Sequence, residues 1–223
     1  MTIVLACSRL WRADMAGSLS QRLGRSVLLV TSPDHLAAAL VRSPDGPTFF
    51  PHWSHRIPPA IFERHECVVF HMTDVPFGRG GSPLQNLIAR GIYETKISAL
   101  RCTADLDAGP VYLKRSLSLE GAAEEIYIRA AAIIEDMIVE IVDRKPQPEP
   151  QSGEPVTFKR RKPEDGNVAQ LGSLQELFDW IRMLDAQDYP PAFLEVGRFR
   201  MEFRRAARRV DRVEADVIIR MKD

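Results

Sequence analysis

The residues of this chain best suited to chemistry are a histidine before a glycine-rich loop and an aspartate within a glycine turn. His71 follows the apolar run CVVF at residues 67–70, which is typical of a buried strand. Asp107 opens the later turn Asp-Ala-Gly-Pro. Open α/β sheets bind ligands beyond the carboxyl ends of their strands, and an imidazole can take up or donate a proton near neutral pH. The sequence therefore predicts a site for proton transfer at the end of a central strand.

The glycine-rich loop after His71 leads into a predicted helix. Ser82 fits the N-cap position, Pro83 fits the first helical position, and Gly91 fits the cap that ends a helix. A loop held between a strand and a helix can fix side chains in place around a ligand. The stretch from His71 to Gly91 is therefore the expected centre of the site.

Strands and helices alternate before this stretch. Apolar runs predict strands at residues 2–7, 26–31 and 48–50, and helical spacing predicts helices at residues 12–23 and 34–42. This order is typical of a parallel sheet with covering helices. No GxGxxG motif follows the first strand, so the fingerprint of a dinucleotide-binding domain is missing. We predict an α/β fold of the Rossmann-like type, with a mostly parallel sheet, flanking helices and a small α+β C-terminal extension.

The later part of the chain predicts a linker and a tail. The prolines of residues 146–150 stop any regular element, and beyond them Ser173 with Glu176 forms a capping box. We therefore expect a catalytic domain at residues 1–145, and a linker with the C-terminal extension at residues 146–223. After the glycine-rich loop, the catalytic domain is expected to continue with strands at residues 95–103 and 111–117 and a helix at residues 121–143. The C-terminal extension is expected to contain a helix at residues 173–185 and strands at residues 193–206 and 213–221.

The composition argues against several classes of protein. The chain has 30 Lys and Arg residues and 30 Asp and Glu residues, so no overall field attracts nucleic acid or an anionic membrane. Cys7, Cys67 and Cys102 lack paired spacing, which is typical of reduced thiols in a cytoplasmic protein. No apolar stretch has the length of a signal-peptide core or a membrane span. His52 and His55 lack the spacing of metal ligands, and no metal site is expected.

Three ordered motifs resemble those of the folate-dependent formyltransferase family, which includes the methionyl-tRNA, glycinamide ribonucleotide and sugar N-formyltransferases. They are HMTDVP from His71, GRGGSP from Gly78 and DAGP from Asp107. The resemblance covers most of residues 45–195 and implies N10-formyltetrahydrofolate as the formyl donor. Val69 departs from the family pattern, because it stands where the family carries an asparagine. A valine cannot donate a hydrogen bond to a developing oxyanion, so this stabiliser is missing or is supplied by Thr73, a backbone amide or water.

By this resemblance, His71 and Asp107 carry the chemistry: His71 moves the proton, and Asp107 orients its ring. Asp105, of the same residue type, is expected to be exposed and to serve a turn. Two of the residues named below have an alternative. Trp53 is left open as an ordinary core aromatic, and the basic cluster around Arg160 is left open as a solvated loop. The residues expected to line the folate are Met72, Thr73, Asp74, Val75 and Trp53. The residues expected to bind the acceptor are Arg79, Arg160, Arg161 and Tyr189.

The acceptor that the resemblance favours is a nucleotide-linked amino sugar. The tail resembles that of the sugar N-formyltransferases, and the balanced charge does not favour tRNA. We expect a UDP-4-amino-4,6-dideoxy sugar of the pseudaminic-acid type, used for surface glycans, in a cytoplasmic protein with no nucleic-acid or membrane partner. A homodimer stays open. The alternatives are formyl transfer to tRNA or a purine precursor, and a catalytically silent relative that binds folate or a nucleotide, which Val69 keeps open.

Overall fold

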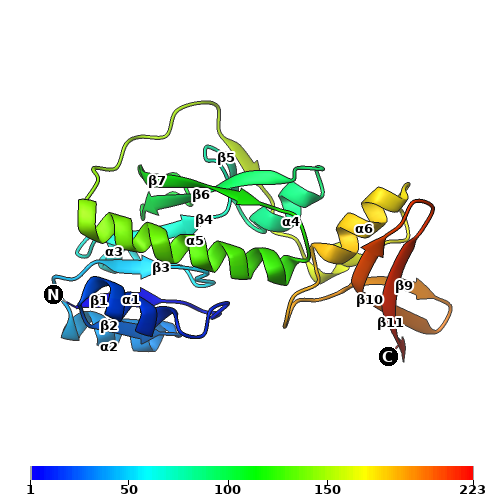
Figure 1. Ribbon diagram of the computed structural model, residues 1–223, viewed down its shortest axis with the longest axis horizontal. Coiled ribbons are helices and arrows are strands. Elements are labelled where there is room, and N and C mark those ends of the chain that lie inside the picture. The colour runs from blue at the N-terminus through cyan, green and yellow to red at the C-terminus, as the bar shows by residue number, and fades with distance from the viewer. Residues whose placement is uncertain (1, 223) are drawn as a thin grey trace. The chain divides into compact units, whose positions relative to one another are not determined.

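The computed structural model describes residues 2–222, which fall into two compact units (Figure 1). The first unit comprises the chain up to Arg79 together with Lys96–Leu117 and Ile128–Thr157. The second unit comprises Gly80–Thr95, Ser118–Tyr127 and the chain from Phe158 onward. Each unit is thus built from segments that lie far apart in the sequence.

A six-stranded sheet with the strand order β2-β1-β3-β4-β6-β7 forms the base of the first unit. β1 pairs in parallel with β2 and β3, β3 pairs in parallel with β4, and β6 pairs antiparallel with β4. The predicted α/β fold with a mostly parallel sheet is therefore confirmed. The strands are β1 (Ile3–Ala6), β2 (Val27–Val30), β3 (Thr48–Phe50), β4 (Cys67–His71), β6 (Glu94–Arg101) and β7 (Val111–Ser118). The helices are α1 (Met15–Leu23), α2 (Pro33–Arg42), α3 (Pro59–Phe62) and α5 (Ala123–Arg144).

The order in which successive strands are added to the sheet reverses at β1. It passes from β1 to β2 on one side and returns beyond β1 to β3 on the other. Because parallel crossovers are right-handed, α1 and α2 cover opposite faces of the sheet. The loops after β1 and β3 therefore leave from a topological switch point, where open α/β sheets form a crevice for ligands. The backbone amide of Ser54 donates to Ser8 Oγ at 2.9 Å and joins these two loops.

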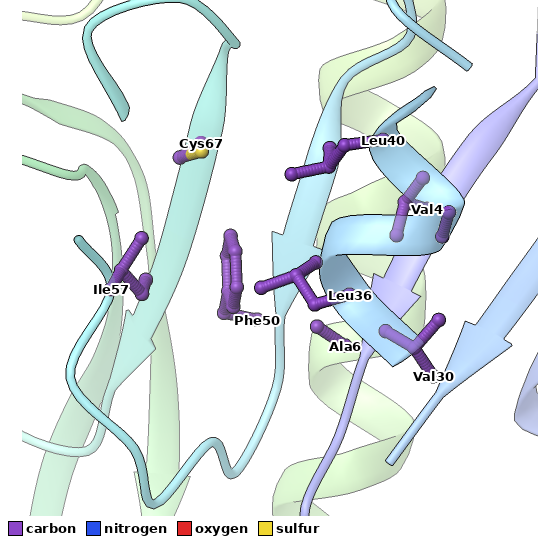
Figure 2. Packing of buried hydrophobic residues seen from close by; sticks show 9 residues of the cluster. Val4, Ala6, Val30, Leu36, Leu40, Phe50, Ile57 and Cys67 are labelled. Carbon is purple, nitrogen blue, oxygen red and sulfur yellow. The ribbon is translucent and has the colours of Figure 1, made fainter. Parts of the chain in front are cut away.

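The pleat of the strands divides the core between the two faces of the sheet. Val4 and Ala6 of β1 pack with Leu36 of α2 and Phe50 of β3 (Figure 2). The alternate residues of β1 point to the opposite face and are also buried. Full burial of an aliphatic or aromatic side chain contributes about 1.5–3 kcal/mol. This layer therefore holds β1 and β3 firmly at the switch point.

Strand β6 differs from the prediction. Polar and apolar residues alternate in the stretch TKISALRCT at residues 95–103, which predicts a strand with one polar and one apolar face, but Ile97, Ser98, Ala99 and Leu100 are all buried. An inner strand of a sheet that is covered on both sides buries both of its faces. The single hydroxyl among these side chains is satisfied, because Ser98 Oγ donates to the carbonyl oxygen of Thr73 at 2.7 Å.

The second unit contains a three-stranded antiparallel sheet with the order β11-β10-β9. The prediction of one strand across residues 193–206 is wrong. Gly197 takes a left-handed φ of 56° in the turn that separates β9 from β10. The elements of this unit are helices α4 (Pro83–Ile88) and α6 (Leu174–Arg182), a 3-10 helix (Pro163–Gly166), and strands β9 (Ala192–Val196), β10 (Phe199–Arg208) and β11 (Val213–Met221).

A further two-stranded sheet pairs β5 (Phe77–Gly80) with β8 (Val156–Phe158). The sequence predicts only loop at both places. Glycines normally weaken a strand, so the stretch FGRG carries no local signal for one. The pairing partner, more than seventy residues away along the chain, is what makes it a strand.

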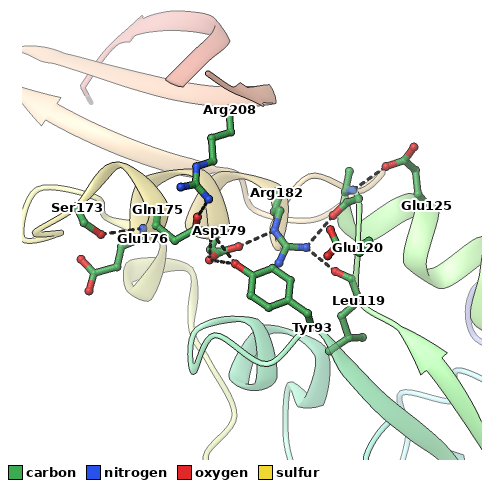
Figure 3. A network of polar contacts seen from close by, with 12 residues as sticks. Tyr93, Leu119, Glu120, Glu125, Ser173, Gln175, Glu176, Asp179, Arg182 and Arg208 are labelled. Carbon is green, nitrogen blue, oxygen red and sulfur yellow. Dashed lines mark hydrogen bonds and ion pairs between the residues drawn. The ribbon is translucent and has the colours of Figure 1, made fainter. Parts of the chain in front are cut away.

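A buried ion pair links α6 to other segments of the second unit. Arg182 and Asp179 are only 3% and 4% exposed. Arg182 Nε donates to Asp179 Oδ1 at 2.6 Å, and Nη1 donates to the carbonyl oxygens of Leu119 and Gly121 at 2.6 and 3.0 Å. The hydroxyl of Tyr93 donates to Asp179 Oδ2 at 3.2 Å (Figure 3). These contacts give Arg182 a structural role.

Candidate active site

His71 is the last residue of β4 rather than the first residue after it. Its side chain is 8% exposed, and Nδ1 lies 3.4 Å from Asp107 Oδ2. On the other side of the ring, Nε2 lies 2.7 Å from the carbonyl oxygen of Gly78. Both neighbouring atoms are acceptors, so both contacts are hydrogen bonds only when the ring carries a proton on each nitrogen. The arrangement therefore suits the form that the ring takes after it accepts a proton.

Asp107 lies in a tight turn between β6 and β7. Its φ of 54° is left-handed, a conformation that Asp tolerates better than most residues. A Cβ on Gly109 would lie 1.8 Å from the carbonyl oxygen of Arg101, so only glycine fits there. The spacing of Asp and Gly in this motif thus has a steric reason. Asp105 is exposed, and its carbonyl oxygen accepts from the amide of Ala108 at 3.3 Å, as predicted for a turn residue.

Three of the residues expected to line the folate are buried. Met72, Thr73 and Val75 are 5%, 0% and 1% exposed. Thr73 Oγ1 donates to the carbonyl oxygen of Gly78 at 3.3 Å, the same atom that the imidazole contacts. Val69 is partly buried and packs against the core cluster. Neither side chain therefore offers the free donor that the family takes from asparagine.

Asp74 forms two ion pairs. Its Oδ2 lies 2.8 Å from Lys96 Nζ, and its Oδ1 lies 2.5 Å from Lys114 Nζ. Partial burial raises the pKa of Asp74, but hydrogen bonds from Lys114 and Lys96 lower it by more, so its net pKa lies below the ordinary value. The carboxylate is ionised at neutral pH and ties the loop after β4 to β6 and β7. The sequence places Asp74 beside the folate but carries no signal for the two lysines.

Trp53 lies in the loop that follows β3. Its ring meets that of Phe50 edge-on, with 5.9 Å between centroids, and packs against the core cluster. These are the contacts of a core aromatic, the placement that the sequence left open. Its indole Nε1 is buried and donates to no acceptor among residues 2–222. Because a buried donor without an acceptor costs about 1–3 kcal/mol, a ligand with an acceptor atom beside Nε1 would gain affinity here.

We expect His52 to make the protein sensitive to acid. Its Nε2 is buried, and burial lowers the pKa of His52 from an ordinary 6.5 to about 4. Between these two values the unfolded chain binds more protons than the folded chain, so the free energy of unfolding decreases as the pH falls. We expect His52 to account for a loss of about 2–3 kcal/mol between about pH 7 and pH 4.5. Urea unfolding at both pH values measures it.

The matched variants for this measurement are His52→Asn and His55→Asn. Asparagine tolerates the left-handed φ of 50° at His52 and does not titrate. The His52→Asn variant should therefore lose less stability in acid than the wild type, whereas the exposed His55 should leave the loss unchanged. An equal loss in the wild type and His52→Asn would contradict the prediction.

Arg79 of β5 is connected to the Asp107 turn through a side chain that the sequence does not single out. Arg79 Nε and Nη2 donate to Gln151 Oε1 at 3.1 and 2.8 Å. Gln151 Nε2 donates to the carbonyl oxygens of Asp107 and Gly109, each at 2.8 Å. Gln151 lies in the proline-rich linker, where neither periodicity nor a motif marks a functional residue.

The other acceptor-binding candidates lie in the second unit. Arg160 is exposed. Arg161 places its guanidinium over the ring of Trp180, 4.6 Å from the centroid. The hydroxyl of Tyr189 lies 2.9 Å from that of Tyr127, and the two rings are stacked. Arg160 is thus the candidate most open to a phosphate, whereas Arg161 and Tyr189 have aromatic partners within the chain.

Ser82 does not cap α4 as predicted. It has a left-handed φ of 50°, and its side chain accepts no hydrogen bond from the helix. Instead, Ser82 Oγ accepts from the backbone amide of Arg161 at 3.0 Å. Asn86 Nδ2 donates to the carbonyl oxygen of Lys159 at 2.9 Å. A tertiary partner has replaced the local cap, and the basic segment is held at its backbone.

No group of three or more His, Cys, Asp or Glu side chains within residues 2–222 is placed to hold a metal ion. No helix in this range is long and apolar enough to cross a membrane. Cys7, Cys67 and Cys102 are free, and burial raises the pKa of the Cys7 thiol to about 11. The Cys7 thiol is therefore protonated and poorly nucleophilic at neutral pH.

Comparison with known proteins points to one family. The family described as "Methionyl-tRNA formyltransferase, C-terminal domain" matches residues 163–220. A solved structure of a methionyl-tRNA formyltransferase from Clostridium thermocellum is 44% identical, with a TM-score of 0.95, and the match covers 100% of both chains. A curated methionyl-tRNA formyltransferase from Ruegeria pomeroyi is 29% identical over 160 residues, which is 66% of this chain and 50% of the relative. The chain spans about half the length of the curated relatives it matches.

A sugar N-formyltransferase from Shewanella has a TM-score of 0.67 and is 15% identical, covering 94% of this chain and 99% of the other. At this identity the likeness shows the fold alone. The nucleotide-sugar acceptor predicted from the sequence therefore has weaker support than an acceptor of the methionyl-tRNA type.

The expectation of no nucleic-acid partner is wrong. It conflicts with a relative that is 44% identical over its whole length and is named for methionyl-tRNA. The expectation rested on the balance of 30 basic and 30 acidic residues, which is an average over the chain. Lys and Arg nevertheless occupy all of positions 159–162. Local clusters of this kind, rather than net charge, decide whether phosphates can be bound.

Proposed function

Because this chain belongs to the folate-dependent formyltransferase family, we propose that it transfers a formyl group from N10-formyltetrahydrofolate to the amine of methionyl-tRNA. The observation that carries the chemical part is the contact of 3.4 Å between His71 Nδ1 and Asp107 Oδ2 at the end of β4. The acceptor is inferred from the named relatives. The activity, the donor and the acceptor are all parts of this proposal.

The chain offers a suitable setting for a flat heteroaromatic cofactor. N10-formyltetrahydrofolate supplies, when bound, the electrophilic formyl carbon. Met72, Val75 and Trp53 would hold it through apolar contact, and the buried Nε1 of Trp53 offers a donor for a ring acceptor atom. Trp53 lies in the loop after β3. This loop and the loop after β1 leave from the switch point at which α/β sheets bind ligands. The residues present therefore fit the group.

The chain's own part in the reaction is to move a proton. An attacking amine must be neutral and must lose a proton as the new bond to carbon forms. His71 accepts that proton, and the Asp107 carboxylate stabilises the positive ring at Nδ1. The carbonyl of Gly78 stabilises the second N–H at Nε2. Because both N–H groups of the protonated ring then have acceptors within the chain, and Thr73 Oγ1 donates to Gly78, the negative charge developing on the formyl oxygen needs a different donor, such as a backbone amide or water.

The acceptor proposal gains support from the basic segment of the second unit. Lys159, Arg160 and Lys162 are exposed, while the backbone between them is fixed by Ser82 and Asn86. A protein backbone that is held in place and presents exposed cationic side chains suits the sugar–phosphate backbone of a nucleic acid. The protein backbone then loses little conformational entropy when the acceptor binds. Within this segment we assign Arg160, which the sequence suggested as an acceptor-binding residue, to a phosphate of the tRNA.

A side-by-side assay of candidate acceptors tests which of them receives the formyl group. The protein is incubated with N10-formyltetrahydrofolate and either methionyl-tRNA or a panel of UDP-, dTDP- and GDP-linked amino sugars. We expect formylmethionine after hydrolysis of the tRNA, at a rate at least about 100-fold above that of any amino sugar. Because phosphate binding releases counterions, kcat/KM for the tRNA should fall steeply with added salt.

Two other outcomes would contradict the proposed acceptor or the proposed activity. A formylated amino sugar without formylmethionine would restore the acceptor predicted from the sequence. No formylation of either acceptor, with folate binding intact, would favour the catalytically silent relative. An Arg160→Gln variant should weaken tRNA binding, whereas Arg129→Gln, outside the segment, serves as the charge-matched control.

A further inference from the structure

Gln151 uses both ends of its side-chain amide within the first unit. Its Nε2 donates to the carbonyl oxygens of Asp107 and Gly109, both at 2.8 Å. Its Oε1 accepts from Arg79 Nε and Nη2 at 3.1 and 2.8 Å. An amide has two donor hydrogens and two acceptor lone pairs, so all of its hydrogen-bonding capacity is used. A side chain satisfied in this way has one preferred position.

One end of Gln151 fixes the turn that carries Asp107. The left-handed φ of 54° at Asp107 costs a residue with a Cβ about 1–2 kcal/mol relative to an ordinary backbone. Such a conformation persists only when surrounding contacts enforce it. The two hydrogen bonds from Gln151 hold the carbonyls on either side of Ala108. They therefore determine where the carboxylate of Asp107 lies against His71 Nδ1.

The other end of Gln151 fixes the strand on the opposite side of the imidazole. Arg79 directly follows Gly78 in β5, and the carbonyl oxygen of Gly78 contacts His71 Nε2 at 2.7 Å. When Gln151 holds Arg79, it also restrains that carbonyl. One amide thus joins the two segments whose acceptors face the two ring nitrogens.

The linker around Gln151 is itself anchored. The backbone amide and carbonyl of Glu149 pair with Val111 of β7 at 2.9 and 2.7 Å. The amide of Val156 donates to the carbonyl oxygen of Pro76 at 3.1 Å. Because the segment is tied to the unit on both sides of Gln151, its amide cannot move away without breaking these contacts.

We propose that Gln151 is the positioning residue of the His71–Asp107 pair. Its kinetic consequence rests on the proposed formyl transfer, whereas its effect on the Asp107 turn does not. Gln151→Glu is the sharpest change, because glutamate keeps the shape of the side chain and an acceptor for Arg79. The variant loses both donors and places a carboxylate oxygen against the carbonyls of Asp107 and Gly109. The turn should therefore move away from the imidazole.

The kinetic arm compares Gln151→Glu with Gln147→Glu. Gln147 is an exposed residue of the same linker and provides the matched control for charge. Misplacing a reacting group by about 1 Å can cost about 100-fold in rate. We expect kcat of Gln151→Glu to fall by about 10- to 100-fold, with KM for the formyl donor within about threefold of the wild type. Gln147→Glu should match the wild type.

The second arm needs no substrate. Amide hydrogen exchange over residues 105–110 should be faster in Gln151→Glu than in the wild type or Gln147→Glu, because the turn has lost two restraining bonds. Exchange at the wild-type rate would overturn the proposal, whatever happens to kcat. A kcat within twofold of the wild type, in a variant whose turn exchanges faster, would overturn it as well. If the wild type formylates no acceptor, the proposed function fails, and the exchange arm alone decides the role of Gln151.

Discussion

Replacing His71 with alanine should lower kcat for formyl transfer by about 10²–10⁴-fold, the usual contribution of a positioned acid or base. The reason is that His71 lies between two acceptors, Asp107 Oδ2 and the carbonyl oxygen of Gly78, which stabilise the ring once it has taken up the proton of the amine. Without the imidazole, the proton of the attacking amine has no acceptor backed by a carboxylate. Single-turnover formylation with saturating donor measures this loss directly. Far-UV circular dichroism and thermal unfolding check that the variant is folded.

Asp107→Asn and Asp105→Asn form the matched pair for the same prediction. Asparagine keeps the size of Asp107 and tolerates its left-handed φ, but cannot stabilise a positive ring. We expect a loss of kcat for Asp107→Asn and none for Asp105→Asn, which is exposed in the same turn. If kcat of both His71→Ala and Asp107→Asn stays within about tenfold of the wild-type value, the assignment of this pair is wrong. The chemical part of the proposed function is then wrong as well.

The parts of the fold that sequence reasoning predicted are those determined by local pattern. β1 and β4 are continuous apolar runs because parallel strands in this position are covered on both faces. Glycine patterns predicted the Asp107 turn for the same local reason, since Gly109 leaves no space for a Cβ. A pattern in the chain itself carries all the information that these elements require.

The parts that it missed depend on distant partners. Ser82 has the ideal residue type for an N-cap, yet its hydroxyl accepts from Arg161, a residue remote in the sequence. Gln151 holds the Asp107 turn from a linker whose prolines predict only irregular structure. A hydrogen bond across such a separation leaves no periodicity in either segment. The candidate pair was therefore predictable, whereas the residues that position it were not.

Replacing Arg182 with methionine should destabilise the protein by about 3–5 kcal/mol, the usual cost of removing one partner from a buried ion pair. Methionine fills similar space but leaves the carboxylate of Asp179, which is 4% exposed, without its cation. The carbonyl oxygens of Leu119 and Gly121 also lose their donor. Urea unfolding at neutral pH measures the change, read from the transition that reports on the second unit.

Two further variants separate this loss from a general effect of removing an arginine. Arg209 pairs with Glu214 at 2.9 Å, but its side chain is 54% exposed, so Arg209→Met should cost less than about 1 kcal/mol. Combining Arg182→Met with Asp179→Leu removes both charges, and the double variant should be more stable than Arg182→Met alone, because no charge is left buried. If Arg182→Met costs no more than Arg209→Met, the pair is not stabilising the second unit. The single variant Asp179→Leu completes the comparison: if the double variant loses the full sum of the losses of Arg182→Met and Asp179→Leu, the loss comes from packing rather than from an unpaired carboxylate.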